Sequence, residues 1–350
     1  MEFALSEDQV MLQSSVTGVL ERSAPLDTIR AIAREEEDGG ALDRALSELG
    51  LAQLAAPEAV GGLGLGLLDA ALVQEALGAS VAPSRFLSTV IALAALGDSE
   101  TDIAAHIASG DMRIAMAVSD VPGARADAGV TATGGQLRGK ALFVFDAEGA
   151  SHILVADREF RVYLVAANAA GLSVHPMPTI DRTRRFSHMV FDGVSAQLLK
   201  GASAMRAIEA GRLLLAADTL GACQSMLDKA VAYSKERKQF NRVIGSFQAV
   251  KHMCAEMAAQ LEPSRALVWH AAHAVDQQFD DASVMVLLAK SHLADVGTFV
   301  ARTSTEVHGG MGFTDLVGLH YWFKRIGVNR QLLGGPERVR AEAARMQGWV

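Results

Sequence analysis

The sequence predicts an α+β protein in which two helical regions flank a β-rich middle. Apolar side chains recur at helical spacing up to about residue 110, and again from Ser203 onward. Between them, short β-rich runs are separated by Gly, Asp and Asn. This order is typical of segregated helices and strands. We therefore expect a helical domain over 1–111, a β-domain over 112–200 and a second helical domain over 201–350.

The composition excludes several classes of protein. Of the 350 residues, 50% are hydrophobic and 21% are charged, which predicts a large core and excludes a disordered chain. A net charge of −8 argues against a nucleic-acid partner. The apolar runs, such as 211–217, fall short of the ~20 residues that span a bilayer, and no basic leader is present, so we expect a cytoplasmic protein with no membrane partner.

Cysteine and histidine usage gives no metal or disulfide framework. Cys223 and Cys254 both lie in apolar helical patterns, which predicts buried thiols. His270 and His273 share a helix face, but no carboxylate stands at ligand spacing. We therefore expect no metal site.

The first helical region begins with a capping signal. Ser6 precedes an acidic first turn and the apolar positions Val10, Leu12, Val16 and Leu20. A glycine-rich loop over 61–64 separates these helices from another over 68–77.

The middle region predicts five β-rich segments, bounded by turn residues. They cover 113–120, 129–145, 150–157, 161–167 and 188–191.

The second helical region predicts four helical stretches. The first covers 204–232, with Asp218 embedded among apolar residues. Ser246 should cap the second, which Pro263 should kink or break. The third covers 284–307, and the last begins after 333–336.

Two segments of this region carry the strongest functional signal. In the first, 233–248, the Arg237 guanidinium offers a planar fork of donors that suits a pyrophosphate, with Gln239 and Phe240 beside it. In the second, 306–314, Gly309 and Gly310 permit close approach of the backbone to a ligand. Taken singly, the first segment is also typical of a solvated basic turn, and the second is also typical of an ordinary helix C-cap.

Taken together and in this order, the two segments resemble the flavin-holding segments of acyl-CoA dehydrogenases. The glycine loop at 61–64, with its neighbours, resembles the N-terminal domain of the same family. The resemblance implies an N-terminal helical domain, a middle β-barrel-like domain and a C-terminal four-helix bundle. It also implies FAD held partly across a subunit boundary of a dimer or tetramer. The cofactor-binding residues would be Arg237, Gln239, Phe240, Gln248, His308, Gly309 and Gly310.

Three features depart from the family pattern. Glu306 stands where the family most often has glutamine. The Thr-Glu-Pro step of the flavin cradle corresponds to 118–122, in which Ser119 could donate to the ring edge. The aromatic-Ile-Ser/Thr step is replaced by Phe143-Val144-Phe145-Asp146.

The catalytic base is the largest departure. Proton removal next to a thioester carbonyl needs a carboxylate in an apolar site. The family places a glutamate at one of two positions, and Gly334 and Gly211 occupy them here. Asp218, two helical turns after Gly211 among apolar neighbours, is the best substitute, with Arg212 at the active-site rim. The competing interpretation of Asp218 is a structural pair with a nearby Arg or Lys.

Other charged residues are weaker candidates. Glu209 should lie at the exposed start of its helix, and Glu337 follows Pro336 in a loop. The run 181–185 resembles the family's approach to the CoA phosphates, and is equally typical of a solvated loop.

The resemblance therefore implies FAD-dependent α,β-dehydrogenation of an acyl-CoA thioester, with an electron-transfer flavoprotein as acceptor. The absence of glutamate at both positions supports a second hypothesis. In it, the chain is a non-catalytic subunit that completes the flavin site of a homologous chain, for example in a heterotetramer. A flavin monooxygenase of the same fold, which needs no such base, is a more remote alternative.

Overall fold

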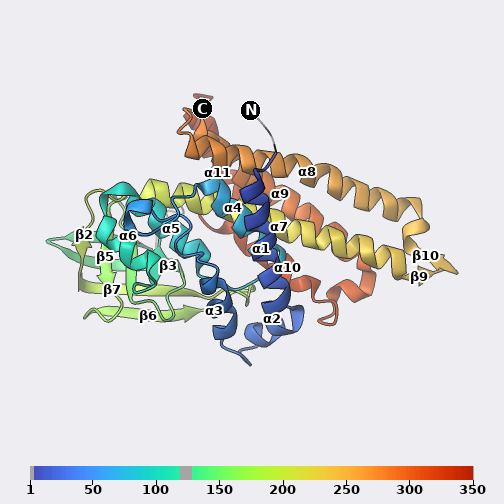
Figure 1. Ribbon diagram of the computed structural model, residues 1–350, viewed down its shortest axis with the longest axis horizontal. Coiled ribbons are helices and arrows are strands. Elements are labelled where there is room, and N and C mark those ends of the chain that lie inside the picture. The colour runs from blue at the N-terminus through green and yellow to red at the C-terminus, as the bar shows by residue number, and fades with distance from the viewer. Residues whose placement is uncertain (1–3, 119–127, 350) are drawn as a thin grey trace.

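The computed structural model describes residues 4–118 and 128–349. The N-terminal helices lie across the middle of the molecule, the sheet lies at one end, and long helices extend to the other end (Figure 1). This arrangement confirms the predicted order of helices, sheet and helices.

The N-terminal region is helical. Its helices are α1 (Glu7–Ser23), α2 (Leu26–Ala33), α3 (Gly40–Glu48), the short η1 (Glu58–Val60), α4 (Leu67–Ala79), α5 (Phe86–Leu96), η2 (Gly97–Ser99) and α6 (Thr101–Ala108). The predicted cap of α1 is confirmed, because the Ser6 hydroxyl accepts from the Gln9 N–H while the Gln9 side chain accepts from the Ser6 N–H.

The middle region forms one eight-stranded sheet. Its strands are β1 (Ile114–Ala117), β2 (Gly129–Thr133), β3 (Gln136–Phe145), β4 (His152–Ala156), β5 (Val162–Ala166), β6 (Leu172–Met177), β7 (Phe186–Ser195) and β8 (Gln197–Leu198). The strand order is β6-β7-β3-β1-β4-β5-β8, and β2 also pairs with β3. Only the β1–β4 pair is parallel among the described strands.

The sheet does not close into a barrel. Its path ends at β6 on one side and at the two-residue β8 on the other, and these two strands do not pair within the described residues. Most side chains of β6 are exposed, as expected for an edge strand. The middle domain is therefore barrel-like only in the loose sense of a sheet that stays open between β6 and β8.

The C-terminal region contains the long helices. They are α7 (Ala204–Glu236), the hairpin β9 (Lys238–Gln239) and β10 (Arg242–Val243), η3 (Ile244–Ser246), α8 (Gln248–Asp276), α9 (Ala282–His308), η4 (Gly309–Phe313), α10 (Leu319–Gln331) and α11 (Pro336–Met346). Helices α7, α8, α9 and α10 pack together as the implied bundle.

Two expectations about α8 differ from the structure. Phe247, not Ser246, is its N-cap residue, and the Ser246 hydroxyl instead donates to the carbonyl of Val243, the residue before η3. Pro263 does not break α8, which continues on both sides of it.

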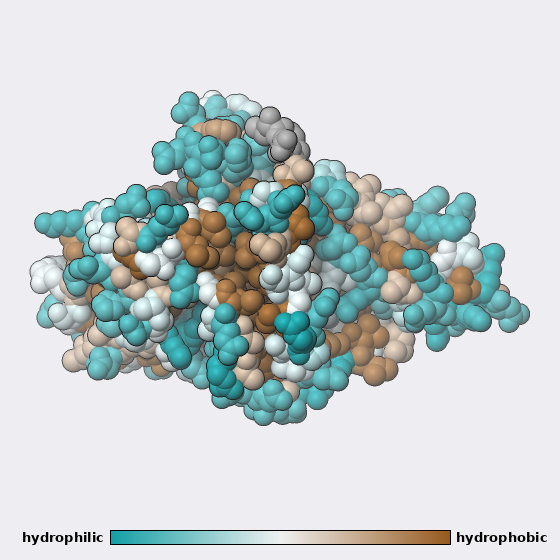
Figure 2. All heavy atoms as spheres, in the orientation of Figure 1, coloured by the Kyte–Doolittle hydropathy of each residue, from teal (hydrophilic) through white to brown (hydrophobic). Residues whose placement is uncertain are grey.

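Most of the core is continuous between the two helical regions. It includes buried residues of α4, α5, α7, α8 and α9 and one face of the sheet, and a second cluster covers the other face. On the face shown in Figure 2, apolar side chains gather where the N-terminal helices meet. Residues 282–313 are long and apolar enough to cross a membrane, but 61% of the apolar 18-residue window within them is buried, as in a core helix. Cys223 is buried as expected, and Cys254 is half-buried.

Helices α4 and α7 approach each other at two glycines. A Cβ on Gly221 would lie 1.8 Å from the Glu75 carbonyl oxygen, and one on Gly78 would lie 2.1 Å from the Asp218 carbonyl oxygen. Both distances are far inside van der Waals contact with backbone atoms, which cannot swing away. These glycines therefore set how closely the N-terminal region packs on α7.

We predict that Gly221→Ala lowers the free energy of unfolding by about 1–3 kcal/mol, because the added methyl forces α4 and α7 apart. Gly18→Ala in α1 is the matched control, since its Cβ meets only the end of the Arg22 side chain at 3.6 Å. That control should be neutral or stabilising by up to about 1 kcal/mol. Denaturant titration measures both, and equal stability of the two variants would contradict the close crossing.

Candidate functional site

The Arg237 turn projects from the end of α7. Phe240 and Asn241 both have positive φ, 50° and 61°, which closes the tight hairpin between β9 and β10. Phe240 is 86% exposed. Arg237, Gln239 and Gln248 are also exposed, and the Arg237 side chain has no partner among the described residues.

The second turn ends α9. His308 is the last helical residue, and Gly309 follows with φ 58°. A Cβ on Gly309 or on Gly310 would meet no atom within 4 Å. Neither glycine is therefore required by packing within this chain. Glu306 is exposed and points away from the core.

The structure brings these two turns together. The rings of Tyr233 and His308 stack with centroids 4.5 Å apart. Tyr233 lies one helical turn before Arg237, and its carbonyl accepts the Arg237 N–H at 2.8 Å. Arg237, Gln239, Phe240, Gly309 and Gly310 are thus exposed at the tip of the molecule, whereas His308, also predicted to bind the cofactor, is buried beneath them.

This region fits an FAD pyrophosphate. Among the described residues it offers a guanidinium with no side-chain partner, an exposed aromatic ring and two glycines whose open backbone leaves room for a ligand. All of these groups are exposed.

The segments expected to hold the flavin ring give less support for a cofactor site than the exposed tip does. Ser119 lies outside the described residues. Phe145 is buried against the ring of Phe186, at 5.6 Å between centroids. Asp146 follows with positive φ, and its carboxyl bonds to the Ser88 hydroxyl at 2.5 Å. Burial raises the pKa of Asp146, against the opposing effects of Ser88 and Arg85.

The two family positions for the base converge in space, and each disfavours a side chain for a different reason. A Cβ on Gly211 would lie 2.4 Å from Leu333 Cδ1 and 3.1 Å from Ile91 Cδ1, so these side chains would have to move. Gly334, next to Leu333, has φ 106°, which side chains rarely adopt. A glutamate at Gly211 would therefore be crowded, and one at Gly334 would strain the backbone.

The Arg212 side chain makes structural contacts within this chain. Its guanidinium makes a bidentate pair with Glu342 of α11, at 2.9 and 2.7 Å, and its Nε donates to the Leu333 carbonyl at 3.0 Å. Nearby, the Lys290 ammonium donates to the Asn329 carbonyl at 2.7 Å. Burial, with the repulsion of Arg212 and Arg330, lowers the pKa of Lys290 to about 7. These contacts fix the turn that carries Gly334.

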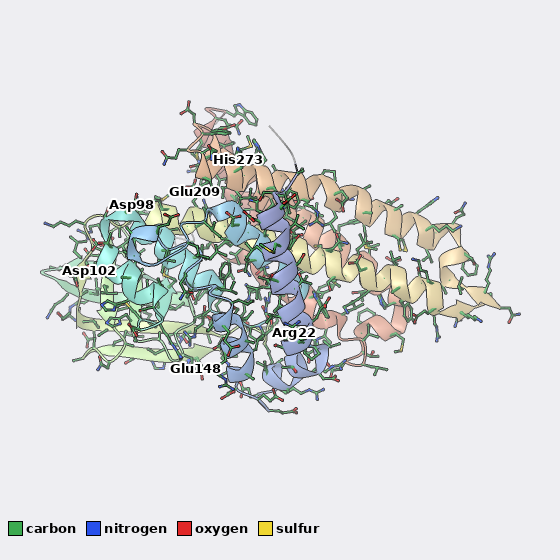
Figure 3. All side chains as sticks on the ribbon, viewed as in Figure 1. Arg22, Asp98, Asp102, Glu148, Glu209 and His273 are labelled. Carbon is green, nitrogen blue, oxygen red and sulfur yellow. The ribbon has the colours of Figure 1, made fainter. Side chains whose placement is uncertain are left out.

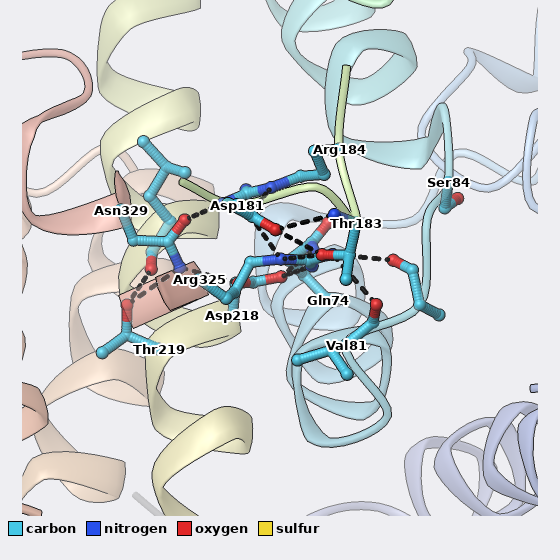
Figure 4. A network of polar contacts seen from close by, with 12 residues as sticks. Gln74, Val81, Ser84, Asp181, Thr183, Arg184, Asp218, Thr219, Arg325 and Asn329 are labelled. Carbon is cyan, nitrogen blue, oxygen red and sulfur yellow. Dashed lines mark hydrogen bonds and ion pairs between the residues drawn. The ribbon is translucent and has the colours of Figure 1, made fainter. Parts of the chain in front are cut away.

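Asp218 is fully buried, and its carboxylate is held by three donors (Figure 4). Gln74 Nε2 donates to it at 2.8 Å and Asn329 Nδ2 at 2.6 Å. Arg325 Nη1 completes the set at 3.3 Å. This is the structural pair that the sequence left as the alternative. Both carboxylate oxygens are therefore engaged by partners within this chain.

The same arginine holds the 181–185 run. Asp181 pairs with Arg325 Nε at 3.0 Å, and Thr183 accepts from the same guanidinium. Burial would raise the pKa of Asp181, but Arg325 and Arg184 outweigh it and the pKa is lowered. Since Asp181 and Thr183 are buried, the solvated-loop interpretation is wrong for these two residues.

The weaker carboxylate candidates lie outside the network around Asp218 and Arg325. Glu209 is only half-buried and lies on the N-terminal part of α7 (Figure 3). Glu337 is exposed and pairs with Arg330 at 3.3 Å. Sequence reasoning did not predict the roles of Arg325 and Asn329. The charge of Arg325 among apolar residues of α10 is a signal that could have indicated a buried ion pair.

Comparison with known proteins identifies the class that this fold and these turns define. Residues 6–100 match the acyl-CoA dehydrogenase N-terminal domain, and residues 200–347 match the acyl-CoA dehydrogenase C-terminal domain. The acyl-CoA dehydrogenase IpdE2 of Mycolicibacterium smegmatis is 31% identical over 336 residues, covering 95% of this chain and 96% of that protein. The chain belongs to the acyl-CoA dehydrogenase family, whose members are flavoprotein oxidoreductases.

Solved structures extend this similarity to the whole fold. The ChsE4–ChsE5 complex from Mycobacterium tuberculosis has a chain with a TM-score of 0.90 at 26% identity, and the alignment covers all of both chains. A chain of the Tcur3481–Tcur3483 steroid acyl-CoA dehydrogenase, G363A variant, has a TM-score of 0.89 at 28% identity, with 98% of each chain covered.

We predict that Asp218→Asn destabilises the fold by about 3 kcal/mol, because it leaves a buried guanidinium short of one anion. Asp192→Asn is the matched control, since that carboxylate is 80% exposed in its pair with Arg138. Chemical denaturation should find the control within about 0.5 kcal/mol of wild type. An Asp218→Asn protein as stable as the control would argue against the structural role.

Proposed function

We propose that this chain acts in FAD-dependent α,β-dehydrogenation of an acyl-CoA thioester as one subunit of a heteromeric enzyme. It completes the FAD site of a homologous chain, and that chain supplies the catalytic base. The observation that carries the proposal is the absence of a carboxylate at both base positions, Gly211 and Gly334, in a chain that keeps an open cofactor-binding tip.

The open tip supports a role in cofactor binding. Arg237 is positioned to donate to the pyrophosphate, and Phe240 offers an apolar face. The Gly309–Gly310 backbone leaves room for the adenosine part. Bound FAD supplies the hydride acceptor for oxidation of the acyl chain. The contribution of this chain is to bind and orient the cofactor from the side that faces a second subunit.

The closed positions support the absence of a base in this chain. A base must lie within hydrogen-bond reach of the α-proton. Gly211 and Gly334 offer no carboxylate, and packing by Leu333 and Ile91 fills the space beside Gly211. Asp218, the substitute expected from the sequence, is committed to Arg325.

The relatives support a two-chain assembly. Two of the similar structures, ChsE4–ChsE5 and Tcur3481–Tcur3483, are described as pairs of chains, and the latter as a steroid acyl-CoA dehydrogenase. A third similar structure is described as an electron transferring flavoprotein. By analogy, we propose a heterotetramer with a homologous chain, and an electron-transfer flavoprotein as the acceptor.

We predict that Arg237→Ala weakens FAD binding by about 1.5–3 kcal/mol, through loss of a charge-assisted contact. Arg22→Ala is the matched control, because Arg22 is also exposed but lies on α1, away from the tip (Figure 3). Equilibrium titration with FAD, followed by flavin fluorescence, gives both affinities. Unchanged affinity in Arg237→Ala would remove the turn from the cofactor site.

We predict that the chain purified alone does not reduce flavin with any acyl-CoA of a panel, and that it does so when co-purified with a homologue bearing the glutamate. The readouts are the visible flavin spectrum and its bleaching by each acyl-CoA. Replacing the homologue's glutamate with glutamine should abolish bleaching, whereas Asp218→Asn in a folded complex should not.

Flavin reduction by this chain alone would overturn the heteromeric assignment and return the base to one of its own carboxylates. A folded complex that never retains FAD would overturn the proposed function itself.

A further inference from the structure

We propose that His308, stacked on Tyr233, is a positioning residue that braces the Arg237 turn against the Gly309–Gly310 turn, and that protonation of its ring loosens this brace and weakens FAD binding. This inference rests on the proposed function, because it concerns how the same cofactor site is held. It adds a residue that acts on the site through its neighbours, and a dependence of cofactor retention on pH.

The geometry links both turns through one ring contact. Tyr233 belongs to α7 and fixes the backbone of Arg237 through its carbonyl, at 2.8 Å. His308 belongs to α9 and directly precedes Gly309. The centroids of the two rings are 4.5 Å apart, with an interplanar angle of 24°. The hairpin and the glycine turn are otherwise exposed, so this stack is well placed to set their relative position.

The hydrogen bonding of His308 fixes its tautomer. Its Nδ1 lies 2.8 Å from the Ser304 carbonyl oxygen, which can only accept, so Nδ1 carries the proton. Nε2 then bears a lone pair in the neutral ring. The side chain is buried, and burial lowers the pKa of His308 below its ordinary 6.5, with the nearby Lys229 acting in the same direction.

Within the described part of the chain, no buried carboxylate pairs with the His308 ring. From α7, Lys229 and Tyr233 face it, and Lys229 is held 4.7 Å above the Trp322 ring of α10. The η4 segment has no titratable side chain. The remaining charged and titratable residues of the neighbourhood are exposed: Arg302 and Glu306 on α9, and Lys251, His252 and Glu256 at the start of α8.

The sign of the pH effect follows from this environment. Above pH 6.5 the ring is neutral whether or not the stack is formed, so the brace contributes fully. As the pH falls below 6.5, the loosened state binds the proton first, and the ordered stack is progressively lost. FAD affinity should therefore fall with acidification over this window.

The test is FAD affinity of the cofactor-retaining complex between pH 5.5 and 7.5, measured by flavin fluorescence. We expect wild type to weaken at least about threefold on acidification across this range. His308→Phe keeps an aromatic ring against Tyr233 but cannot titrate, so most of this pH dependence should disappear. His292→Phe, an exposed histidine on the same helix, is the matched control and should keep the wild-type profile.

A second variant separates the stack from the titration. Tyr233→Leu removes the ring contact and should weaken FAD binding at pH 7.5, where His308 is neutral. Thermal unfolding without FAD checks that each variant is folded. If His308→Phe does not fold, His308→Asn replaces it. That variant keeps a donor near the Nδ1 position without the ring, and should bind more weakly with a flat profile.

Different outcomes overturn the inference and the proposed function. If the FAD affinity of the wild type does not change with pH, or if His308→Phe loses affinity on acidification as the wild type does, the inference is overturned while FAD binding stands. Absence of FAD binding at every pH, with the homologous chain present, would overturn the proposed function.

Discussion

The buried guanidinium of Arg325 is the interaction on which the arrangement of the three regions depends. It lies on α10 and is 1% exposed. Its donors reach Asp218 on α7, Asp181 and Thr183 in the β6–β7 connection, and the Val81 carbonyl after α4 (Figure 4). A buried cation is tolerated only when its partners are all in place. Helices and sheet must therefore meet in one arrangement, which the glycine contacts between α4 and α7 reinforce.

This constraint also decides what the interior can do chemically. A general base must lie within hydrogen-bond reach of the proton that it removes. The oxygens of Asp218 are instead engaged by Gln74, Asn329 and Arg325. The carboxylate that sequence reasoning placed in an apolar helix face is part of the network that orders the fold, and acting as a base would require it to leave that network.

Local sequence signals predicted much of the fold, but features that depend on contacts between distant residues could not be predicted from them. The Ser6 cap, the end of α9 at Gly309 and the β-rich middle depend on neighbours in sequence, and all three were predicted correctly. The pairing of Asp218 with Arg325 could not be read locally, because the two residues lie 107 positions apart. The same holds for the filled space beside Gly211, which depends on Leu333. Helix α8 continues through Pro263, where local preference alone predicts a break.

Helix α7 separates the two halves of the site. Gly211, near one end, is packed closed, whereas Arg237, just past the other end, is open, and the 26 positions between them span about 39 Å. In the proposed function, the open end acts on a ligand held by a neighbouring subunit, while the closed end concerns this chain's own interior. A chain can thus lose its base without losing its part in a neighbour's cofactor site, which is the physical basis for dividing one reaction between two homologous subunits.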